Sequence, residues 1–516
     1  MQVCSAVTPR LSLRTLLPQA EILGADDIQV DRCVCDSRLV GPGDLFVAIR
    51  GCQQDGRQFI PDAVARGAAA VLCQEEAISE GDSPIFAARK SGQSPKLYLS
   101  PFPDVPVCLV PNARDAYGRI CQGLAGNPSF RLKVIGITGT NGKTTTSCLV
   151  ASVLRKAAYR VGLLGTLGYF DGDDVEPATH TTPPAAPLAM LLARMLANEC
   201  SHAVMEISSR ALSQSRVAGM RLDAACVTNV SRDHLDGHPT IQDYRLAKSK
   251  IFDHLAPEGF AVINADDPVA AAYLRRLDGP ALSVGIHRPA EITATPLEQC
   301  PSEQTFLLTA GSETVPVRTR MIGVHHIYNC LTAAAVGLAY GIDLVTVVRG
   351  LEAIDYVPGR LERIECGQPF GVFLDWAQTP DALAACLDAL RKVTAGRLIA
   401  VFGASGDRDR RKRPLMGRAV ENAAEVAVLT SDNPRSEDPQ EIIAQILEGF
   451  QHPQNARVIA DRAEAVRWAL AEARPGDCVL LAGRGREECR IGGDEPIPLS
   501  DRQIAEEWLY QRDLGI

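Results

Sequence analysis

The chain has no run of apolar residues long enough to cross a bilayer, no CxxC pair and no block of like charges. The missing apolar run argues against a membrane span. The absence of CxxC pairs among 16 scattered cysteines argues against a zinc site and a disulfide framework. The first thirty residues include Pro9, Arg10, Arg14 and Pro18 without a long apolar core, so no secretory signal is expected. These absences predict a reduced, cytoplasmic protein.

The net charge of −9 is spread along the chain, which argues against nucleic acid as the main partner. The hydrophobic content of 46% and the charged content of 22% are ordinary for a globular protein. A length of 516 residues suggests about three domains. We therefore expect small-molecule partners, with neither nucleic acid nor a membrane among them.

Residues 134–146 read VIGITGTNGKTTT, which predicts a strand, a loop that surrounds a polyphosphate, and a helix over about 144–158. Lys143 is placed to reach the terminal phosphates, and the Thr144 hydroxyl can meet Mg²⁺. The helix N-terminus points its positive end at the anion. Ile137 stands where a standard P-loop has its first glycine, so an ordinary strand–helix turn is the alternative. The residues expected at the nucleotide are Gly139, Thr140, Asn141, Gly142, Lys143, Thr144 and Thr145.

The middle of the chain alternates strand and helix patterns, which predicts an α/β fold with a largely parallel sheet. Its further strands are expected at 203–207, 224–228 and 261–264. Residues 281–318 show short alternating runs, which favour antiparallel hairpins at a sheet edge.

The last region alternates regularly and predicts a doubly wound sheet. Its strands are expected at 371–375, 398–402, 426–430 and 478–482. Its helices are expected at 380–393, 414–422, 439–450 and 462–473.

Polar residues follow every predicted strand of the second and third regions. In open α/β sheets, ligands gather at the carboxyl ends of the strands. One such position is better explained as a helix cap or a solvated loop, but eight together indicate a ligand cleft between two domains. The positions concerned are the phosphate loop 139–145, 206–209, Asn229, 233–236, Asp375, 403–409, 432–435 and 483–487.

Glu206 follows a strand beside the phosphate loop and is a natural Mg²⁺ ligand or an indirect partner of the ion. His234 could coordinate or orient a second metal, although an isolated histidine is more often structural. Without a known relative, Lys248 would be interpreted as a solvated lysine on a helix.

The third region carries charges of both signs at its strand ends. Arginine can bind a carboxylate through two hydrogen bonds, and a carboxylate can bind an ammonium group. This mixture suits a zwitterion such as an amino acid, and surface ion pairing is the alternative on residue types alone. The charged residues are Arg408, Asp432, Arg435 and Glu487.

Together these residues resemble the Mur ligases, ATP-dependent enzymes that build the stem peptide of peptidoglycan. The resemblance extends over nearly the whole chain, from Asp36 to Arg502. It implies a small α/β UDP-binding domain (1–110), a central P-loop-type ATPase domain (111–357) and a Rossmann-like amino-acid-binding domain (358–516). ATP and Mg²⁺ are the implied cofactors, and a monomer is expected. The residues that match across the family are Lys143, Glu206, His234, Asn329, Arg360 and Asp375.

Within the family, the chain is most similar to ligases that add the third residue to UDP-N-acetylmuramoyl-L-alanyl-D-glutamate through an acyl phosphate. The positions that match the uridine-nucleotide site are Ser37, Cys52, Gln53 and Gln54. The positions that match the muramoyl-dipeptide site are Thr181, Thr182, Ser208, Gln214 and Arg216. Lys248 matches a lysine that the family carbamylates, which would make it a metal ligand together with Thr144, Glu206 and His234.

Residues 432–435, Asp-Asn-Pro-Arg, have the form seen in ligases that use meso-diaminopimelate. Diaminopimelate carries a carboxylate and an ammonium at its far end, whereas lysine carries only the ammonium. A buried Arg435 would therefore lack its anion with lysine as substrate. The full set that matches the diaminopimelate site is Arg408, Asp432, Asn433, Pro434, Arg435, Gly483 and Glu487.

The chain departs from the family pattern near the ATP and acceptor sites. Trp376 replaces a tyrosine and could still stack on adenine. The departures leave open a sister ligase for L-lysine, another amino acid or a folate, and a drifted nucleotide-sugar-binding paralogue with weak activity. Arg210, Gln378, Arg486 and Cys52 stand where histidine is usual, and His326 where asparagine is usual.

Overall fold

The computed structural model describes residues 10–51, 54–75, 105–233, 235–275, 277–491 and 496–513. The chain divides into two compact units, and each is considered by itself. Unit 1 comprises residues 1–133, 182–201 and 210–222, and unit 2 comprises residues 134–181, 202–209 and 223–516. Across the residues that the structure describes, no helix is long and apolar enough to span a membrane.

Unit 1 is built on a five-stranded sheet with the order β2-β7-β6-β5-β4. The strands β4 to β7 pair in parallel, and β2 closes one edge in the antiparallel sense. The strands of this unit are β1 (Leu11–Ser12), β2 (Glu21–Leu23), β3 (Gln29–Val30), β4 (Cys33–Val34), β5 (Leu45–Ala48), β6 (Ala70–Gln74) and β7 (Val107–Val110). Its helices are α1 (Leu13–Leu16), α2 (Ile60–Ala65), α3 (Ala113–Leu124) and α5 (Ala185–Ala197).

The central sheet of unit 2 has eleven strands in the order β11-β10-β9-β12-β8-β13-β14-β15-β16-β17-β18. They are β8 (Lys133–Thr138), β9 (Val161–Gly165), β10 (Gly168–Phe170), β11 (Val175–Glu176), β12 (His202–Glu206), β13 (Leu222–Val227), β14 (Leu255–Asn264), β15 (Ala281–Gly285), β16 (Ile292–Cys300), β17 (Glu303–Ala310) and β18 (Glu313–Thr319). The helices here are α4 (Lys143–Lys156), α7 (Ile241–Ser249), α8 (Pro268–Leu274), α9 (Val324–Ala339) and α10 (Leu344–Glu352). The short helix α6 (Ser209–Ser213) begins in this unit at Ser209, and its other residues belong to unit 1.

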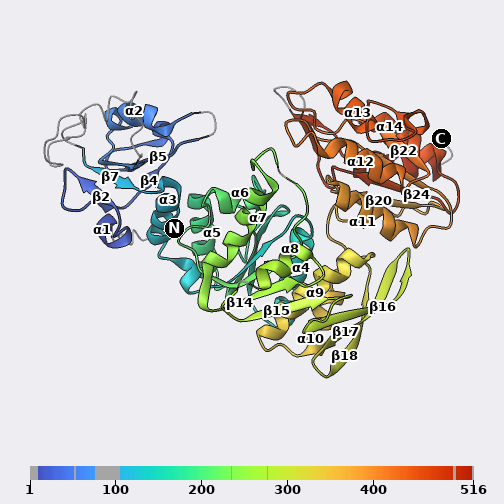
Figure 1. The fold of residues 1–516 in the computed structure, drawn as a ribbon, viewed down its shortest axis with the longest axis horizontal. Coiled ribbons are helices and arrows are strands. Elements are labelled where there is room, and N and C mark those ends of the chain that lie inside the picture. The colour runs from blue at the N-terminus through green and yellow to red at the C-terminus, as the bar shows by residue number, and fades with distance from the viewer. Residues whose placement is uncertain are drawn as a thin grey trace. The chain divides into compact units, whose positions relative to one another are not determined.

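The predicted antiparallel edge is confirmed for β16, β17 and β18, which form the arm at one end of the sheet in Figure 1. The prediction is wrong for residues 281–285, because β15 pairs in parallel with both β14 and β16. The physical reason is the crossover helix α8 between β14 and β15, since such a connection returns the chain in the parallel sense.

The carboxyl-terminal part of unit 2 is a doubly wound α/β sheet, as predicted, with the order β19-β20-β24-β21-β22-β23. The strands are β19 (Glu362–Arg363), β20 (Gly371–Asp375), β21 (Leu398–Phe402), β22 (Val426–Leu429), β23 (Arg457–Val458) and β24 (Cys478–Ala482), followed by the hairpin β25 (Cys489–Ile491) and β26 (Pro496–Pro498). The helices α11 (Pro380–Arg391), α12 (Lys412–Glu421) and α13 (Pro439–Leu447) pack in one core cluster. The helices α14 (Arg462–Glu472) and α15 (Asp501–Asp513) pack in another.

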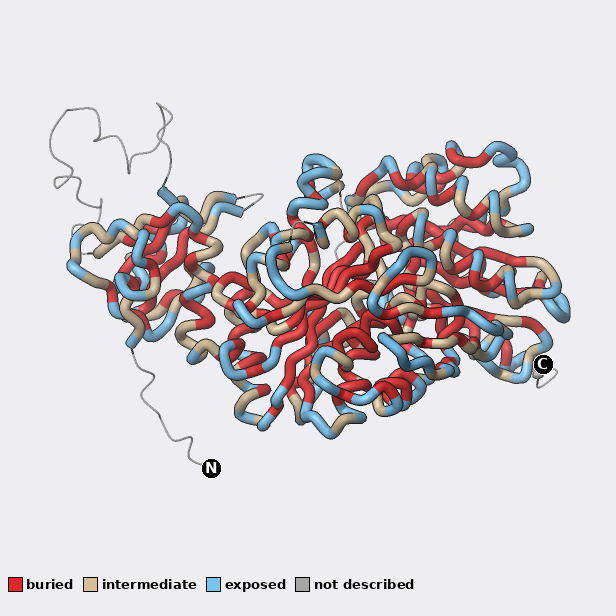
Figure 2. Tube along the Cα trace, turned by 60° about the horizontal axis from the view of Figure 1, so that its bottom comes forward, coloured by how far each residue is buried: buried red, intermediate tan, exposed pale blue. Residues whose placement is uncertain are grey.

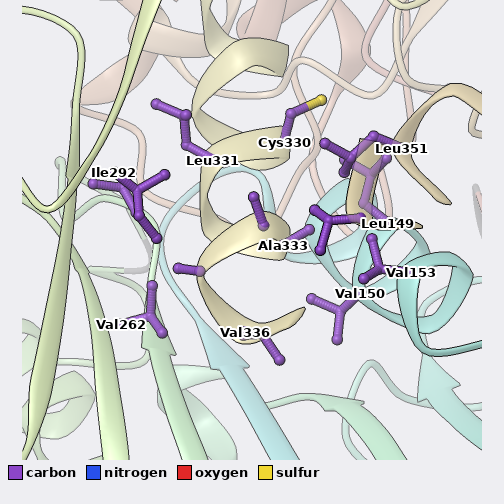
Figure 3. Packing of buried hydrophobic residues seen from close by; sticks show 14 of the residues in the cluster. Leu149, Val150, Val153, Val262, Ile292, Cys330, Leu331, Ala333, Val336 and Leu351 are labelled. Carbon is purple, nitrogen blue, oxygen red and sulfur yellow. The ribbon is translucent and has the colours of Figure 1, made fainter. Parts of the chain in front are cut away.

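Buried positions follow the strands and the inner faces of the helices (Figure 2). The largest cluster joins α4, α9 and α10 to the central sheet (Figure 3). Small side chains on α9 allow the close approach of α4, which carries the phosphate loop at its N-terminus. The rigidity of this core therefore fixes the loop. The predicted domain boundaries near residues 110 and 357 stay a prediction.

We expect Gly350→Ala to destabilise the protein. A Cβ atom on Gly350 would lie 2.5 Å from the Cα of Val153, although alanine normally improves a helix. Backbone cannot move aside as a side chain does, so the clash should outweigh the gain by about 1–3 kcal/mol. Thermal and urea unfolding would measure the loss. Gly279→Ala is the control because nothing lies within 4 Å of its Cβ position, and equal stability of the two variants would contradict the prediction.

Candidate active site

The phosphate loop runs from β8 to α4 and depends on two glycines. Gly139 and Gly142 have φ angles of +155° and +85°, which side chains rarely tolerate. A Cβ atom would lie 1.9 Å from Thr228 Oγ1 at Gly139 and 2.5 Å from Asn329 Oδ1 at Gly142. Since Gly142 is the N-cap of α4 and has no side chain, the first amides of the helix can face an anion.

Lys143 folds back over the loop. Its Nζ donates to the carbonyl oxygens of Gly139 and Thr140 at 2.8 and 3.0 Å. Burial lowers the pKa of Lys143, while Glu206 and Asp233 act in the opposite direction. The ammonium is therefore held at the loop, among groups that a polyphosphate would complement.

Glu206, at the end of β12, is buried with 1% of its surface exposed. Its Oε2 accepts from Thr144 Oγ1 at 2.9 Å and from Thr166 Oγ1 at 3.2 Å, and its Oε1 accepts from the Thr166 amide at 2.7 Å. The first turn of α4 and the turn after β9 thus meet at the carboxylate that ends β12. Thr166 was not predicted, because β9 was not recognised as a strand.

The oxygen donors at this point fit Mg²⁺, which prefers carboxylates, phosphates and water. Thr144 Oγ1 and Glu206 Oε2 lie 2.9 Å apart, so one ion could contact both. Over the part of the chain that the structure describes, no group of three or more His, Cys, Asp or Glu residues could hold a metal by itself. Phosphates and water would therefore have to complete the coordination.

Lys248 on α7 is not the solvated lysine that residue type alone indicated, since only 1% of its surface is exposed. Its Nζ donates to the Gly139 carbonyl oxygen at 2.6 Å and lies 4.7 Å from the centre of the Tyr244 ring. Burial, with a contribution from Lys143, lowers the pKa of Lys248 well below its usual range. A neutral amine is the form that can react with carbon dioxide.

The loop after β13 forms three ion pairs with the segment that leads into α12. Arg408 Nη1 and Asp236 Oδ2 are 3.0 Å apart, and Lys412 Nζ and Asp233 Oδ1 are 3.3 Å apart. Arg232 Nε and Asp409 Oδ2 are 3.5 Å apart. Asp233 and Asp236 lie in a segment that the sequence places at the expected cleft, whereas Lys412 is not indicated by the sequence. His234, predicted as a metal ligand, lies outside the described residues.

Three further residues that match the family lie in unit 2, namely Arg360, Asn329 and Asp375. Two of them contact threonines next to the phosphate loop. Arg360 Nη2 donates to Thr144 Oγ1 at 2.9 Å, and its guanidinium carbon is 5.5 Å from the centre of the Trp376 ring. Asn329 Oδ1 accepts from Thr146 Oγ1 at 3.1 Å. Asp375 Oδ2 accepts from the Leu361 amide at 2.6 Å, and burial raises the pKa of Asp375.

The predicted amino-acid residues Asp432, Asn433, Gly483 and Glu487 form one cluster. Asn433 Nδ2 donates to Glu487 Oε2 at 2.7 Å, and a Cβ atom on Gly483 would lie 2.7 Å from Asp432 Oδ2. Asp432 Oδ1 accepts from Ser405 Oγ at 3.0 Å, while its Oδ2 is buried without a hydrogen-bond partner in the described chain. Burial and the charge of Asp432 raise the pKa of Glu487.

Arg435 and Arg408 lie near each other at this cluster. Burial lowers the pKa of Arg435, and the positive charge of Arg408 lowers it further. Within the described residues, Arg435 Nε is buried and has no hydrogen-bond partner. Pro434 helps to set this turn, because its carbonyl oxygen accepts from the Glu437 amide at 3.0 Å. Two neighbouring cations with an unsatisfied donor suit an anionic group.

The residues predicted for the UDP-linked substrate are divided between the units. In unit 1, Arg216 donates to the Thr182 carbonyl oxygen at 2.8 Å and to Gln214 Oε1 at 3.0 and 3.1 Å. Ser37 is buried in a short helical turn of the same unit, where Gln54 is exposed. In unit 2, Thr181 Oγ1 accepts from Thr166 Oγ1 at 3.3 Å. Ser208 is half-buried there, and Cys52 and Gln53 lie outside the described residues.

The positions that depart from the family pattern have defined surroundings. Gln378 Nε2 donates to the Gly483 carbonyl oxygen at 2.8 Å. Arg486 Nη2 donates to the carbonyl oxygens of Thr166 and Leu167. His326 is buried, and burial together with His325 and Arg360 keeps the pKa of His326 well below its usual range. Arg210 is exposed on α6.

Three family models match the chain in order: Mur ligase family, catalytic domain (residues 29–122), Mur ligase middle domain (137–337) and Mur ligase, glutamate ligase domain (359–485). The UDP-N-acetylmuramoyl-L-alanyl-D-glutamate–2,6-diaminopimelate ligase of Geobacillus thermodenitrificans is 39% identical over 485 residues, covering 92% of this chain and 94% of its own. The ligase of the same name from Chlorobium phaeobacteroides is 40% identical over 524 residues, covering 98% of both chains.

Solved structures agree with this assignment. A structure of UDP-N-acetylmuramoyl-L-alanyl-D-glutamate–2,6-diaminopimelate ligase aligns with a TM-score of 0.65 and 28% identity, covering 98% of this chain and 99% of its own. The folylpolyglutamate synthase of Mycobacterium tuberculosis, complexed with ADP and AMPPCP, shares the fold at 20% identity and a TM-score of 0.60, covering 78% of this chain and 95% of its own. Because relatives 39–40% identical align over more than nine-tenths of the chain, it belongs to the Mur ligase family.

Proposed function

We propose that this protein is the ATP-dependent ligase that joins meso-diaminopimelate to UDP-N-acetylmuramoyl-L-alanyl-D-glutamate in peptidoglycan synthesis. Relatives named for this reaction cover nearly the whole chain. The observation that carries the choice of amino acid is a cluster with both signs of charge, formed by Arg408, Arg435, Asp432 and Glu487.

The phosphate loop, Lys143 and the N-terminus of α4 would hold the terminal phosphates of ATP. Phosphate oxygens would replace the carbonyl oxygens that Lys143 now contacts. Thr144 and Glu206 would hold Mg²⁺, with carbamylated Lys248 and His234 as ligands of a second ion. Bound Mg²⁺ would neutralise charge on the transferring phosphoryl group. Arg360 and Asn329 keep the loop in place through Thr144 and Thr146.

The reaction has two chemical steps. The D-glutamate side-chain carboxylate attacks the γ-phosphorus of ATP, which forms an acyl phosphate and releases ADP. The amine of diaminopimelate then attacks the acyl carbon, loses a proton, and the tetrahedral intermediate expels phosphate to leave the new amide bond. Loop amides and Lys143 provide fixed positive charge where the oxyanions develop.

The amino-acid cluster would hold the distal end of diaminopimelate by charge. Arg408 and Arg435 suit its carboxylate, and a bidentate contact would satisfy the buried Nε of Arg435. The ammonium would meet Asp432 and Glu487. Since burial and Asp432 raise the pKa of Glu487, a bound cation would favour its ionised form. Lysine lacks the carboxylate and would leave the buried Nε of Arg435 unpaired.

The UDP-linked dipeptide would be held by Ser37, Cys52, Gln53 and Gln54 at the uridine nucleotide. Thr181, Thr182, Ser208, Gln214 and Arg216 would hold its muramoyl-dipeptide part. We further infer that the carboxyl-terminal region closes on ATP to bring the amine to the acyl phosphate. The cysteines among the described residues form no disulfide, which supports a reducing cytoplasmic location. We expect a monomer.

Phosphate release tests the proposed function directly. Purified protein with Mg-ATP and UDP-N-acetylmuramoyl-L-alanyl-D-glutamate should release phosphate with meso-diaminopimelate, and not with L-lysine or without an amino acid. Release with lysine alone would keep the ligase reaction and overturn the amino-acid assignment. Binding of the nucleotide sugar without release under any condition would identify a binding protein instead.

Arg435→Ala should lower kcat/KM for diaminopimelate roughly 30-fold or more, because a charged partner of the substrate is lost. The effect should appear mainly in KM. Arg435→Lys should recover only part of the loss, since an ammonium cannot contact a carboxylate bidentately. Arg457→Ala is the control, because Arg457 on β23 lies over the ring of Trp468 on α14 and is not a member of the cluster. An unchanged KM in Arg435→Ala would reject the assignment.

Lys248→Ala should abolish turnover and leave ADP binding measurable, because a carbamate on Lys248 would supply a metal ligand and no nucleotide contact. The lowered pKa of Lys248 favours the neutral amine, which is the form that reacts with carbon dioxide. Wild-type protein depleted of carbon dioxide should therefore lose activity and regain it with bicarbonate. Full activity of the depleted protein, with mass spectrometry showing no adduct, would contradict this role.

A further inference from the structure

Arg486 links the carboxyl-terminal part of unit 2 to the turn between β9 and β10. It lies in the loop after β24, and its Nη2 donates to the carbonyl oxygens of Thr166 and Leu167 at 3.1 and 2.8 Å. The family usually has histidine at this position. A guanidinium is longer and carries more donors than an imidazole, which allows it to hold two successive carbonyl groups.

The same turn orients the carboxylate of Glu206. The Thr166 amide donates to Oε1 at 2.7 Å, and Thr166 Oγ1 donates to Oε2 at 3.2 Å. Thr166 therefore contacts both groups. Its amide and hydroxyl donate to Glu206, and its carbonyl oxygen accepts from Arg486. Any shift of this turn would move the donors that orient the carboxylate.

Arg360 acts on Glu206 from the other side. Its Nη2 donates to Thr144 Oγ1 at 2.9 Å, and that hydroxyl donates to Glu206 Oε2 at 2.9 Å. Two arginines from residues 358–516 therefore reach one carboxylate of the central sheet, each through a threonine.

The two arginines belong to one rigid piece of backbone. A Cβ atom on Gly359, next to Arg360, would lie 2.7 Å from the Arg486 amide nitrogen. The Trp376 amide donates to the Gly359 carbonyl oxygen at 2.9 Å, and the Gly485 amide donates to the Asp375 carbonyl oxygen at 3.2 Å. Arg360 and Arg486 must therefore engage or release Thr144 and Thr166 together.

We propose that Arg486 is a positioning residue for the metal-binding carboxylate, acting on Glu206 through Thr166. This inference rests on the proposed function, because it assigns Glu206 to Mg²⁺. Arg486 couples the docking of the carboxyl-terminal region to the geometry of the metal site. Its side chain is exposed, so its removal leaves the buried core intact. The loss should appear in metal affinity, where partners that orient a ligand contribute roughly 10- to 100-fold.

The test measures Mn²⁺ binding to the full-length protein with ADP, by electron paramagnetic resonance, and the Mg²⁺ dependence of phosphate release. Arg486→Ala should weaken Mn²⁺ binding about tenfold and raise the half-saturating Mg²⁺ concentration similarly. ADP binding without metal should be unchanged. Arg486→Lys should be intermediate, and it keeps the test available if the alanine variant is unstable. Arg467→Ala, an exposed arginine on α14, is the control and should bind Mn²⁺ normally.

A double-mutant cycle separates positioning from a general effect on folding. Thr166→Ala removes the hydroxyl contact with Glu206 but keeps the carbonyl oxygen that Arg486 holds. If Arg486 acts through Thr166, the combined variant should lose less metal affinity than the product of the single losses. Unchanged Mn²⁺ affinity in Arg486→Ala, or fully multiplicative losses, would overturn the proposal. Wild-type protein that binds Mn²⁺ and ADP but releases no phosphate would reject the proposed function alone, because the affinity comparison still decides the role of Arg486.

Discussion

The Glu206 carboxylate is almost entirely removed from water, and both of its oxygens accept hydrogen bonds from Thr144 or Thr166. A buried carboxylate is tolerated only when donors or cations compensate for the lost hydration. Those donors come from the first turn of α4, which follows β8, and from the turn after β9, and β12 lies between these two strands. The order of strands in the sheet therefore decides whether the group can exist. Gly165 is part of the same constraint, because a Cβ atom there would lie 2.2 Å from Glu206 Oε1.

Two lysine side chains meet at one carbonyl oxygen of the phosphate loop. Lys143 and Lys248 both donate to the Gly139 carbonyl oxygen, and burial lowers the pKa of each. A polyphosphate would bring negative charge to Lys143, and a carbamate on Lys248 would turn its amine into an anionic group. The loop is therefore organised for a charged ligand.

A buried ion pair and a buried arginine support the amino-acid cluster. Arg462 Nη2 and Asp501 Oδ2 are 2.6 Å apart beneath the strand ends, and Arg484 Nη1 donates to Asn433 Oδ1 at 3.2 Å. This network holds Asn433, which in turn donates to Glu487. Such buried pairs contribute little net stability, but they fix the direction of neighbouring groups. Here they fix a carboxylate that would meet a substrate ammonium.

The sequence by itself determined the phosphate loop, the α/β class and the doubly wound carboxyl-terminal sheet, because glycine positions and apolar periodicity are local signals. The strands 371–375, 398–402 and 478–482 were predicted to the residue. Tertiary structure alone decided the parallel pairing of β15, the burial of Lys248 and the contacts of Thr166 and Arg486. Those features depend on groups that are far apart in the chain and come into contact only when the strands align. A local sequence pattern does not indicate such long-range contacts.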